Sequence, residues 1–416
     1  MREILVFADW IGLPEAMNMG ILRSEHSKGE EVFSFEYAES WLESGYAQEL
    51  DPDLRLFAGP QYVSDSKPNF GLFLDSSPDR WGRMLMERRE ALISRKTEQP
   101  IKRLMESDYL LGVNDETRMG ALRFKLDKDE DYLSDHAGII APPFTSIREL
   151  EQASLRLEDE DFFKDEDAQK WLMMLMAPGS SLGGARPKAS VMDLERHLWI
   201  AKFPSKNDRK DSGAWELIVN QMAAETGINV AIGEAGIFSQ KRHTFLTKRF
   251  DRTSDNQRIH FASAMSLLGY KDGYNHKDGG SYLDMVEFIE RYGSEPDEDI
   301  RELWRRIVFS VAISNTDDHL RNHGFLLAAT GWRLSPAYDI NPVEKGTGLS
   351  LNISEDDNSL DFDLCISVID YFRWQEEEAL SFITKTKEIV SQWKKRASQM
   401  KIPDSEQILM ETAFER

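Results

Sequence analysis

The chain has 416 residues, roughly two to three times the ~150 residues of a typical domain, so one large two-lobed unit or two to three domains are expected. Hydrophobic residues make up 41% and charged residues 30%, with 15 Pro and 26 Gly, which excludes disordered, collagen-like and low-complexity chains. Lys plus Arg number 51 against 73 Asp plus Glu. The net charge of −22 argues against direct binding to nucleic acid or to an anionic membrane.

Cysteine content and hydropathy indicate the compartment. The single cysteine, Cys365, cannot form an intramolecular disulfide, which favours a reducing environment. The N-terminus lacks the apolar core of a signal peptide, and no stretch approaches the roughly 18 apolar residues of a membrane span. These features predict a cytoplasmic protein without membrane contact.

The first part of the chain is expected to be rich in β-structure. Residues 4–8 form a short apolar run, and Val32–Tyr37 alternates with the period of two of a half-buried strand. The segment Asp75–Arg83 then supplies N-cap residues, and apolar residues at helical spacing predict a helix that continues to Ile93. These patterns predict a small β-rich region that ends in a helix.

The middle and the end of the chain are expected to alternate helices and strands, then become mainly helical. The expected elements are a helix from Asp167 to Pro178, a loop from Ser180 to Lys188, a strand at Leu198–Phe203, a helix at Trp215–Thr226 with Gly227 after its end, a strand at Thr244–Phe250, and helices at roughly 262–268, 281–292, 299–314 and 375–399.

A dense polar segment, N-T-D-D-H-L-R-N at residues 315–322, follows an apolar helix face. Asp317 and Asn322 have the D-x-x-x-x-N spacing of a kinase catalytic loop. In such a loop the Asp accepts the hydrogen bond of the substrate hydroxyl, and the Asn ligates Mg²⁺. An Asx-rich turn at a helix end is the structural alternative.

A second acidic residue, Asp339, lies 22 residues after Asp317, behind Tyr338 and a short apolar strand. This is the place of the second metal-binding Asp of a kinase, although D-I-N replaces D-F-G. A turn at an edge strand is the alternative.

Upstream, a phosphate-binding lobe is indicated by the order of three features. Gly183 and Gly184 lie in a loop ahead of the strand that carries Lys202, and Glu216 follows 14 residues later at the start of a helix. Glycines let backbone N–H groups approach phosphates, a strand Lys supplies positive charge, and a helix Glu orients that Lys. The loop meets neither the G-x-x-x-x-G-K-[ST] nor the G-x-G-x-x-G pattern.

The strings S-S-L-G-G-A-R-P-K, W-I-A-K-F-P, K-R-F-D-R, N-T-D-D-H-L-R-N and A-Y-D-I resemble the HipA family. Its members are serine/threonine kinases that act as toxins of bacterial type II toxin–antitoxin pairs. The motif F-L-D-S-S-P-D-R-W-G-R is similar to the family's N-terminal subdomain, so the resemblance covers most of residues 1–340.

The resemblance implies a role for each matching residue. Asp317 becomes the catalytic base, Asn322 and Asp339 the metal ligands, and Lys202 the residue that pairs with the phosphates. The remaining positions implied are Gly183, Gly184 and Ala185 as the loop over the phosphates, Lys248, Phe250 and Asp251 at the hinge that holds adenine and ribose, and His319 and Tyr338 in the same cleft.

Two further positions stand out against the family pattern. The serine that undergoes autophosphorylation, which expels the loop and inactivates the kinase, matches Ser181, with Ser180 beside it. Asp318 is a departure, because family members commonly have a small residue there.

The sequence therefore predicts an α+β fold with a protein-kinase-like, two-lobed core. The expected divisions are an N-terminal β-rich subdomain (1–125), a nucleotide-binding small lobe (126–250) and a helical catalytic lobe (251–416). The resemblance implies ATP and Mg²⁺ as cofactors, a HipB-like antitoxin that makes the DNA contacts, and a translation component such as glutamate–tRNA ligase as substrate. A small-molecule kinase and an inactive, antitoxin-bound co-repressor are the alternatives.

Overall fold

The computed structural model describes residues 1–416 except 28, 65–66, 134–140, 160, 166, 177–183 and 185. The chain forms two compact units. Unit 1 comprises residues 1–207 and 251–262, and unit 2 comprises residues 208–250 and 263–416. The chain crosses between them three times. The expected divisions after residues 125 and 250 stay predictions. Among the described residues, no helix has the length and apolar character needed to span a membrane.

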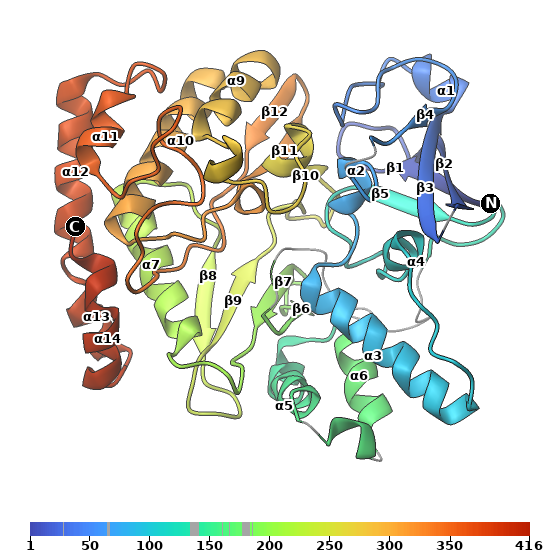
Figure 1. Cartoon of the computed structure of the whole chain (residues 1–416), viewed down its shortest axis with the longest axis horizontal. Coiled ribbons are helices and arrows are strands. Elements are labelled where there is room, and N and C mark those ends of the chain that lie inside the picture. Colours follow the sequence, from blue (N-terminus) through green and yellow to red (C-terminus); the bar gives the residue numbers. More distant parts are fainter. Residues whose placement is uncertain are drawn as a thin grey trace. The chain divides into compact units, whose positions relative to one another are not determined.

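Unit 1 begins with an antiparallel sheet of order β4-β3-β2-β1-β5 (Figure 1). Its described strands and helices are β1 (Arg2–Ala8), β2 (Met17–Ser27), β3 (Glu30–Tyr37), α1 (Glu39–Leu42), β4 (Gln61–Tyr62), α2 (Gly71–Leu74), α3 (Arg80–Thr97), α4 (Glu106–Leu111), β5 (Leu122–Lys125), α5 (Ile147–Leu157), α6 (Ala168–Met176), β6 (Lys188–Met192) and β7 (Leu198–Lys202).

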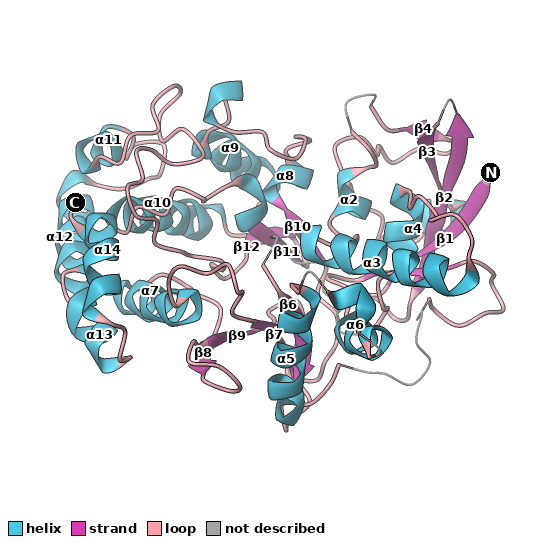
Figure 2. Ribbon diagram, turned by 60° about the horizontal axis from the view of Figure 1, so that its bottom comes forward, coloured by secondary structure: helices cyan, strands magenta, loops and turns pink. Residues whose placement is uncertain are grey.

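The core of unit 1 follows the alternation of the sequence. In β3, Phe33, Phe35 and Tyr37 are buried and the intervening residues are not, as the period of two predicts. The ring of Phe73 lies 5.5 Å from that of Phe35 and 6.2 Å from that of Phe124, measured between centroids. A second layer contains α3, α5 and α6, which pack side by side (Figure 2).

Unit 2 is mainly helical. Its described strands and helices are α7 (Ser212–Thr226), β8 (Gly233–Gly236), β9 (Thr244–Lys248), α8 (Ala264–Leu267), α9 (Tyr282–Tyr292), α10 (Pro296–Ala312), β11 (Gly324–Ala328), β12 (Gly331–Leu334), α11 (Phe362–Ser367), α12 (Glu376–Val390), α13 (Trp393–Gln399) and α14 (Asp404–Phe414), while β10 (Phe261–Ser263) lies where the chain enters unit 2.

Helix α10 is the centre of unit 2. It places Trp304, Ile307, Val308 and Val311 in the core, which confirms the predicted apolar face. Helix α12 packs against both α7 and α10 (Figure 1). Helix α7 ends at Gly227, whose φ of 102° gives the predicted C-terminal cap.

Two expected elements differ from the structure, and one strand was not expected. The helix expected at 375–399 is two helices, because α12 ends at Val390, where the Ser391 hydroxyl donates to the carbonyl of Glu388. The helix expected at 262–268 is only the four-residue α8, preceded by β10. Strand β6, at the end of the glycine-containing loop, was not expected.

Candidate functional site

The segment from Asn315 to Asn322 forms a compact loop after α10 in unit 2. Ser314 starts it with a positive φ of 52°, and a short 3₁₀ turn, Leu320–Asn322, ends it. The side chain of Asp317 is exposed, whereas Asn322 is buried. Asn322 Nδ2 donates a 2.9 Å hydrogen bond to the backbone carbonyl of Asp317. The two residues of the D-x-x-x-x-N pattern are therefore held together.

Asp339 follows a short extended segment that is hydrogen-bonded to residues 229–231 of the same unit. The amide of Ala337 donates to the carbonyl of Asn229 (2.8 Å), and the amide of Ala231 donates to the carbonyl of Ala337 (2.9 Å). Asp339 itself has a φ of 56°, a left-handed conformation that is uncommon outside glycine and tolerated best by Asn and Asp. Asn341 Nδ2 donates to Asp339 Oδ1 at 3.1 Å.

Tyr338 connects this segment to the catalytic loop. Its hydroxyl donates a 2.7 Å hydrogen bond to the carbonyl of Arg321. Its ring lies 5.4 Å from that of Phe250, with 39° between the planes. Within unit 2, the Tyr338 hydroxyl thus links the segment before Asp339 to the loop that carries Asp317 and Asn322, and the Tyr338 ring contacts Phe250, two residues after β9.

His319 and Lys248 lie in the same unit. His319 precedes the 3₁₀ turn, and its carbonyl accepts the amide of Asn322 at 2.8 Å. Lys248 is the last residue of β9. Glu216 is buried in the first turns of α7.

The remaining candidates belong to unit 1. Lys202 ends β7 and lies opposite Lys188 of β6. Asp251 is fully buried, and its Oδ2 accepts hydrogen bonds from the amide of Gly120 (2.8 Å) and from Arg252 (2.6 Å). Of the loop, Gly184 is exposed with a φ of +107°. Gly183, Ala185, Ser180 and Ser181 lie outside the described residues.

An ion pair that the sequence did not predict anchors the described end of this loop. Lys188 Nζ lies 2.7 Å from Asp79 Oδ2, and both side chains are at most 2% exposed. Lys188 Nζ also donates to the carbonyl of Gly184 (3.3 Å), and Trp81 Nε1 donates to the carbonyl of Lys188 (3.0 Å). The D-S-S-P-D-R-W-G-R motif therefore holds the R-P-K motif, and the two strings are too far apart in the chain for the sequence alone to show this pairing.

Lys188→Met should lower the free energy of unfolding by about 3–5 kcal/mol, because it leaves the carboxylate of Asp79 buried without its cation. Lys164→Met is the matched control, since Lys164 pairs with Asp161 while both side chains are at least 77% exposed. Urea unfolding followed by tryptophan fluorescence measures both. Equal midpoints for the two variants would contradict a structural role for the buried pair.

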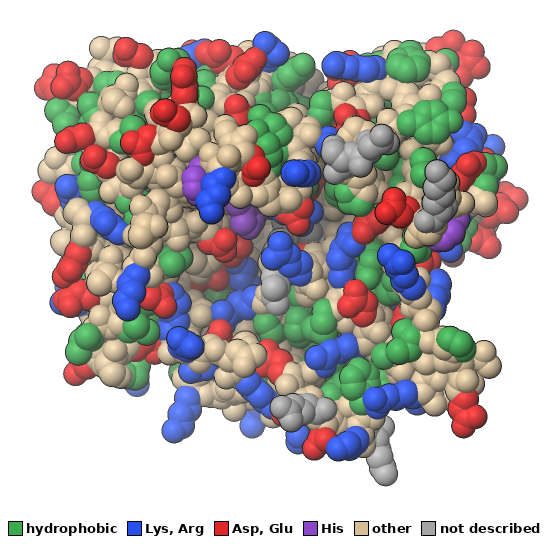
Figure 3. Space-filling view, in the orientation of Figure 1, with side chains coloured by type: hydrophobic (Ala, Val, Ile, Leu, Met, Phe, Trp, Pro, Cys, Tyr) green, Lys and Arg blue, Asp and Glu red, His purple; other side chains and the backbone are tan. Residues whose placement is uncertain are grey.

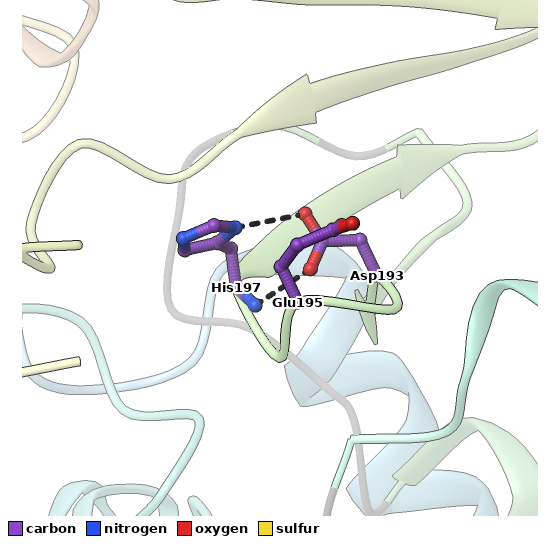
Figure 4. A group of neighbouring side chains, drawn as sticks. All are labelled: Asp193, Glu195 and His197. Atoms are coloured by element: carbon purple, nitrogen blue, oxygen red, sulfur yellow. Dashed lines mark hydrogen bonds and ion pairs between the residues drawn. The ribbon is translucent and has the colours of Figure 1, made fainter. Parts of the chain in front are cut away.

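A second group of possible ligands, Asp193, Glu195 and His197, lies in the turn between β6 and β7 (Figure 4). Asp193 accepts hydrogen bonds from the His197 amide (2.7 Å) and from Trp199 Nε1 (2.8 Å), and its Oδ2 lies 3.1 Å from His197 Nδ1. Burial opposes ionisation, but these bonds outweigh it and hold the pKa of Asp193 below its usual value. The contacts of Asp193 are those of a residue that closes a hairpin.

Charged side chains of both signs are interspersed over the face drawn in Figure 3. This view therefore shows no single acidic face.

Comparison with known proteins identifies the family. Residues 180–401 match the family model of the HipA-like C-terminal domain, which is more than half of the chain. The chain belongs to the HipA family. This HipA-family chain also matches the solved structure of the Shewanella oneidensis HipA–HipB–operator DNA complex, with a TM-score of 0.65 and 15% identity over 95% of this chain and 93% of that chain. This likeness confirms the predicted fold, a two-lobed, kinase-like α+β fold.

A curated relative in Haemophilus influenzae carries the name "Putative kinase". It is 25% identical over 183 residues, which is 40% of this HipA-family chain. The match spans only 53%, about half, of the relative's own length.

Proposed function

We propose that this protein is an ATP- and Mg²⁺-dependent serine/threonine protein kinase and the toxin of a type II toxin–antitoxin pair. The hydrogen bond from Asn322 to the carbonyl of Asp317 is the observation that carries the proposal. It gives the D-x-x-x-x-N pattern the compact loop in which a kinase Asp receives the substrate hydroxyl and a kinase Asn ligates Mg²⁺. Membership of the HipA family and the name of the Haemophilus relative support the same chemistry.

The donor atoms in unit 2 fit Mg²⁺. Asn322 can offer Oδ1, because its Nδ2 is already engaged with the loop, and Asp339 can offer its carboxylate. Mg²⁺ prefers oxygen ligands and is commonly held by one or two carboxylates together with phosphate oxygens. When bound, the cation would neutralise charge on the phosphates of ATP.

In the proposed reaction Asp317 orients the acceptor hydroxyl and receives its proton. The hydroxyl oxygen bonds to the γ-phosphorus of ATP while the bond from that phosphorus to the bridging oxygen breaks, which releases ADP. The family resemblance of the sequence supplies the remaining proposed roles: Lys202 to neutralise charge on the phosphates, Glu216 to orient that lysine, and Gly183, Gly184 and Ala185 to cover the phosphates.

For the nucleotide base, we assign the rings of Phe250 and Tyr338, which lie 5.4 Å apart at the end of β9. Lys248 and His319 lie in the same unit and would contact the ribose or the phosphates. Asp251 follows Phe250 where the chain leaves unit 2, and its Oδ2 already binds Gly120 and Arg252. Its proposed role is to fix this hinge.

The proposed partner is a small, basic, HipB-like antitoxin that contacts DNA itself. The solved Shewanella relative is a complex of HipA with HipB and operator DNA, and the net charge of −22 of this chain suits a basic partner.

The proposed substrate is a translation component such as glutamate–tRNA ligase. Incubation of that ligase with the protein, Mg²⁺ and labelled ATP tests the substrate. Label on the ligase that Asp317→Ala abolishes supports it, and label only on the kinase removes the ligase from the proposal.

Autophosphorylation of Ser181 should inactivate the enzyme. A phosphoserine carries roughly −1.5 to −2 charges, which repel the phosphates of ATP and attract cations such as Arg186 and Arg321. Lys188, the third candidate in the sequence, is already paired with Asp79. Mass spectrometry after incubation with ATP should place phosphate on Ser181, and Ser181→Ala should stay active for longer. Ser180→Ala is the control that distinguishes the two serines. Phosphate on neither serine, or full activity of the Ser181-phosphorylated protein, would exclude this switch.

A further inference from the structure

Asp318, the residue after the proposed base, points away from solvent into the core of unit 2. Its side chain is only 7% exposed. Asp318 Oδ2 accepts hydrogen bonds from the hydroxyls of Tyr282 (2.6 Å) and Ser310 (3.2 Å). Asp318 Oδ1 lies 2.9 Å from Nε2 of His323. Neighbouring acids in the sequence thus have opposite environments, because Asp317 is exposed.

The contacts of Asp318 favour its ionised, carboxylate form. Burial opposes ionisation of Asp318, but its contacts with His323 and Tyr282 outweigh burial and hold its pKa below the usual value. Burial and the neighbouring carboxylate raise the pKa of Tyr282, so its hydroxyl stays protonated and donates. A buried carboxylate is costly unless it is hydrogen-bonded, and Asp318 accepts hydrogen bonds from the hydroxyls of Tyr282 and Ser310.

The partners of Asp318 come from different parts of unit 2. Tyr282 begins α9, Ser310 lies in the last turns of α10, and His323 follows Asn322 directly. The carbonyl of His323 also accepts the amide of Ala264 at 2.8 Å, at the start of α8. Asp318 therefore ties the loop between Asp317 and Asn322 to two long helices of the core.

A small cavity of about 20 Å³ lies beneath the same loop. Its lining includes Asp318, Asn322, His323, Asn315 and Tyr338. Asn315 Oδ1 and both ring nitrogens of His323 are buried without a partner of hydrogen-bond geometry among the residues that the structure describes, although Nε2 lies 2.9 Å from Asp318 Oδ1. The lining also includes apolar residues such as Ile228 and Phe309, but the volume has room for about one water molecule, and the polar atoms of Asn315 and His323 are groups that bind water.

We propose that Asp318 is a positioning residue for phosphoryl transfer: with Tyr282, Ser310, His323 and one enclosed water, it fixes the loop so that Asp317 faces the acceptor hydroxyl. This inference rests on the proposed function, since it assigns a role to the support of the same loop. Asp318 neither receives the proton nor ligates the cation. Groups that orient a ligand or base in this way typically alter activity by about 10–100-fold when removed.

The test compares Asp318→Ala, Asp318→Asn and Tyr282→Phe in the full-length protein. Asp318→Ala should lower kcat by about 10–100-fold and leave the KM for ATP within about threefold, because no ATP contact is removed. Asp318→Asn should recover part of this loss, since its Oδ1 still accepts the Tyr282 hydroxyl. Tyr282→Phe removes one oxygen atom from the core and should give a smaller fall in kcat.

Asp299→Asn is the matched control. Asp299 is a buried acid of the same unit, its side chain is 4% exposed, and it pairs with Arg333 at 3.0 Å, outside the loop. This variant should be destabilised without a loss of kcat. If Asp299→Asn loses as much kcat as Asp318→Ala, or if both Asp318→Ala and Tyr282→Phe stay within about twofold of the unmodified protein, the positioning role is overturned.

Hydrogen–deuterium exchange of the peptide that covers residues 315–323 separates this inference from the proposed function. Faster exchange there in Tyr282→Phe and Asp318→Ala, with unchanged exchange in α12, supports the positioning role. If the unmodified protein transfers no phosphoryl group, the proposed function fails. The exchange rates then still test whether Asp318 and Tyr282 fix the conformation of the loop. Unchanged exchange at 315–323 would overturn the inference.

Discussion

Asp317→Ala should reduce phosphoryl transfer by about 10²–10⁴-fold while the affinity for ATP and Mg²⁺ changes by less than about threefold. The substitution removes the carboxylate that positions the acceptor hydroxyl. It leaves the backbone carbonyl of Asp317, which is the atom that Asn322 binds, so the loop should keep its conformation. Single-turnover kinetics gives the rate, and calorimetry gives the affinity for the nucleotide.

Asp356→Ala provides the control for this prediction, because Asp356 is an exposed acid of the same unit outside the loop. Its activity should equal that of the unmodified protein. Retention of full activity by Asp317→Ala would reject Asp317 as the catalytic residue. A loss of ATP affinity as large as the loss of rate would show that Asp317 acts in binding the nucleotide.

Asp339→Asn should weaken the binding of ATP in the presence of Mg²⁺ by at least about tenfold, because the cation loses an anionic ligand. Binding of ATP without Mg²⁺ should be unchanged or stronger, since a negative charge near the phosphates is removed. Asn is the suitable replacement because, like Asp, it tolerates the φ of 56° at this position. Calorimetric titrations with and without Mg²⁺ measure the difference.

Asn341→Ala is the companion variant for Asp339. It removes the 3.1 Å hydrogen bond to Asp339 Oδ1 and keeps the carboxylate, so its effect on the Mg²⁺ dependence should be smaller. Equal binding of ATP with and without Mg²⁺, in both the unmodified protein and Asp339→Asn, would show that Asp339 is not a metal ligand.

Short-range patterns predicted the parts of the fold that depend on neighbouring residues. The alternation in β3 and the apolar face of α10 both appear in the core, because one face of each element must be buried whatever the rest of the chain does. The break between α12 and α13 was missed, since helix propensity continues through Ser391 and only its bond to Glu388 marks the end. Strand β6 was missed because it has only five residues, two of which, Lys188 and Ser190, are polar.

In the candidate site, too, the sequence predicted contacts between residues that are near each other in the chain but not contacts between distant ones. The spacing of Asp317 and Asn322 predicted a compact loop, and the structure has a hydrogen bond between them. The support beneath the loop could not be predicted in this way, because Tyr282 lies 36 residues from Asp318 in the chain. Likewise, Asp79 and Lys188 are 109 residues apart, and only the tertiary structure pairs them.

Transfer of the labelled γ-phosphoryl group of ATP to a protein serine or threonine tests the proposed activity most directly. We expect Mg²⁺-dependent label on the unmodified protein or an added protein substrate, mapped to a hydroxyl side chain, and almost none with Asp317→Ala or Asp339→Asn. Equal labelling by all three proteins, or label that appears without Mg²⁺, would contradict the assignment of this loop as a kinase catalytic centre.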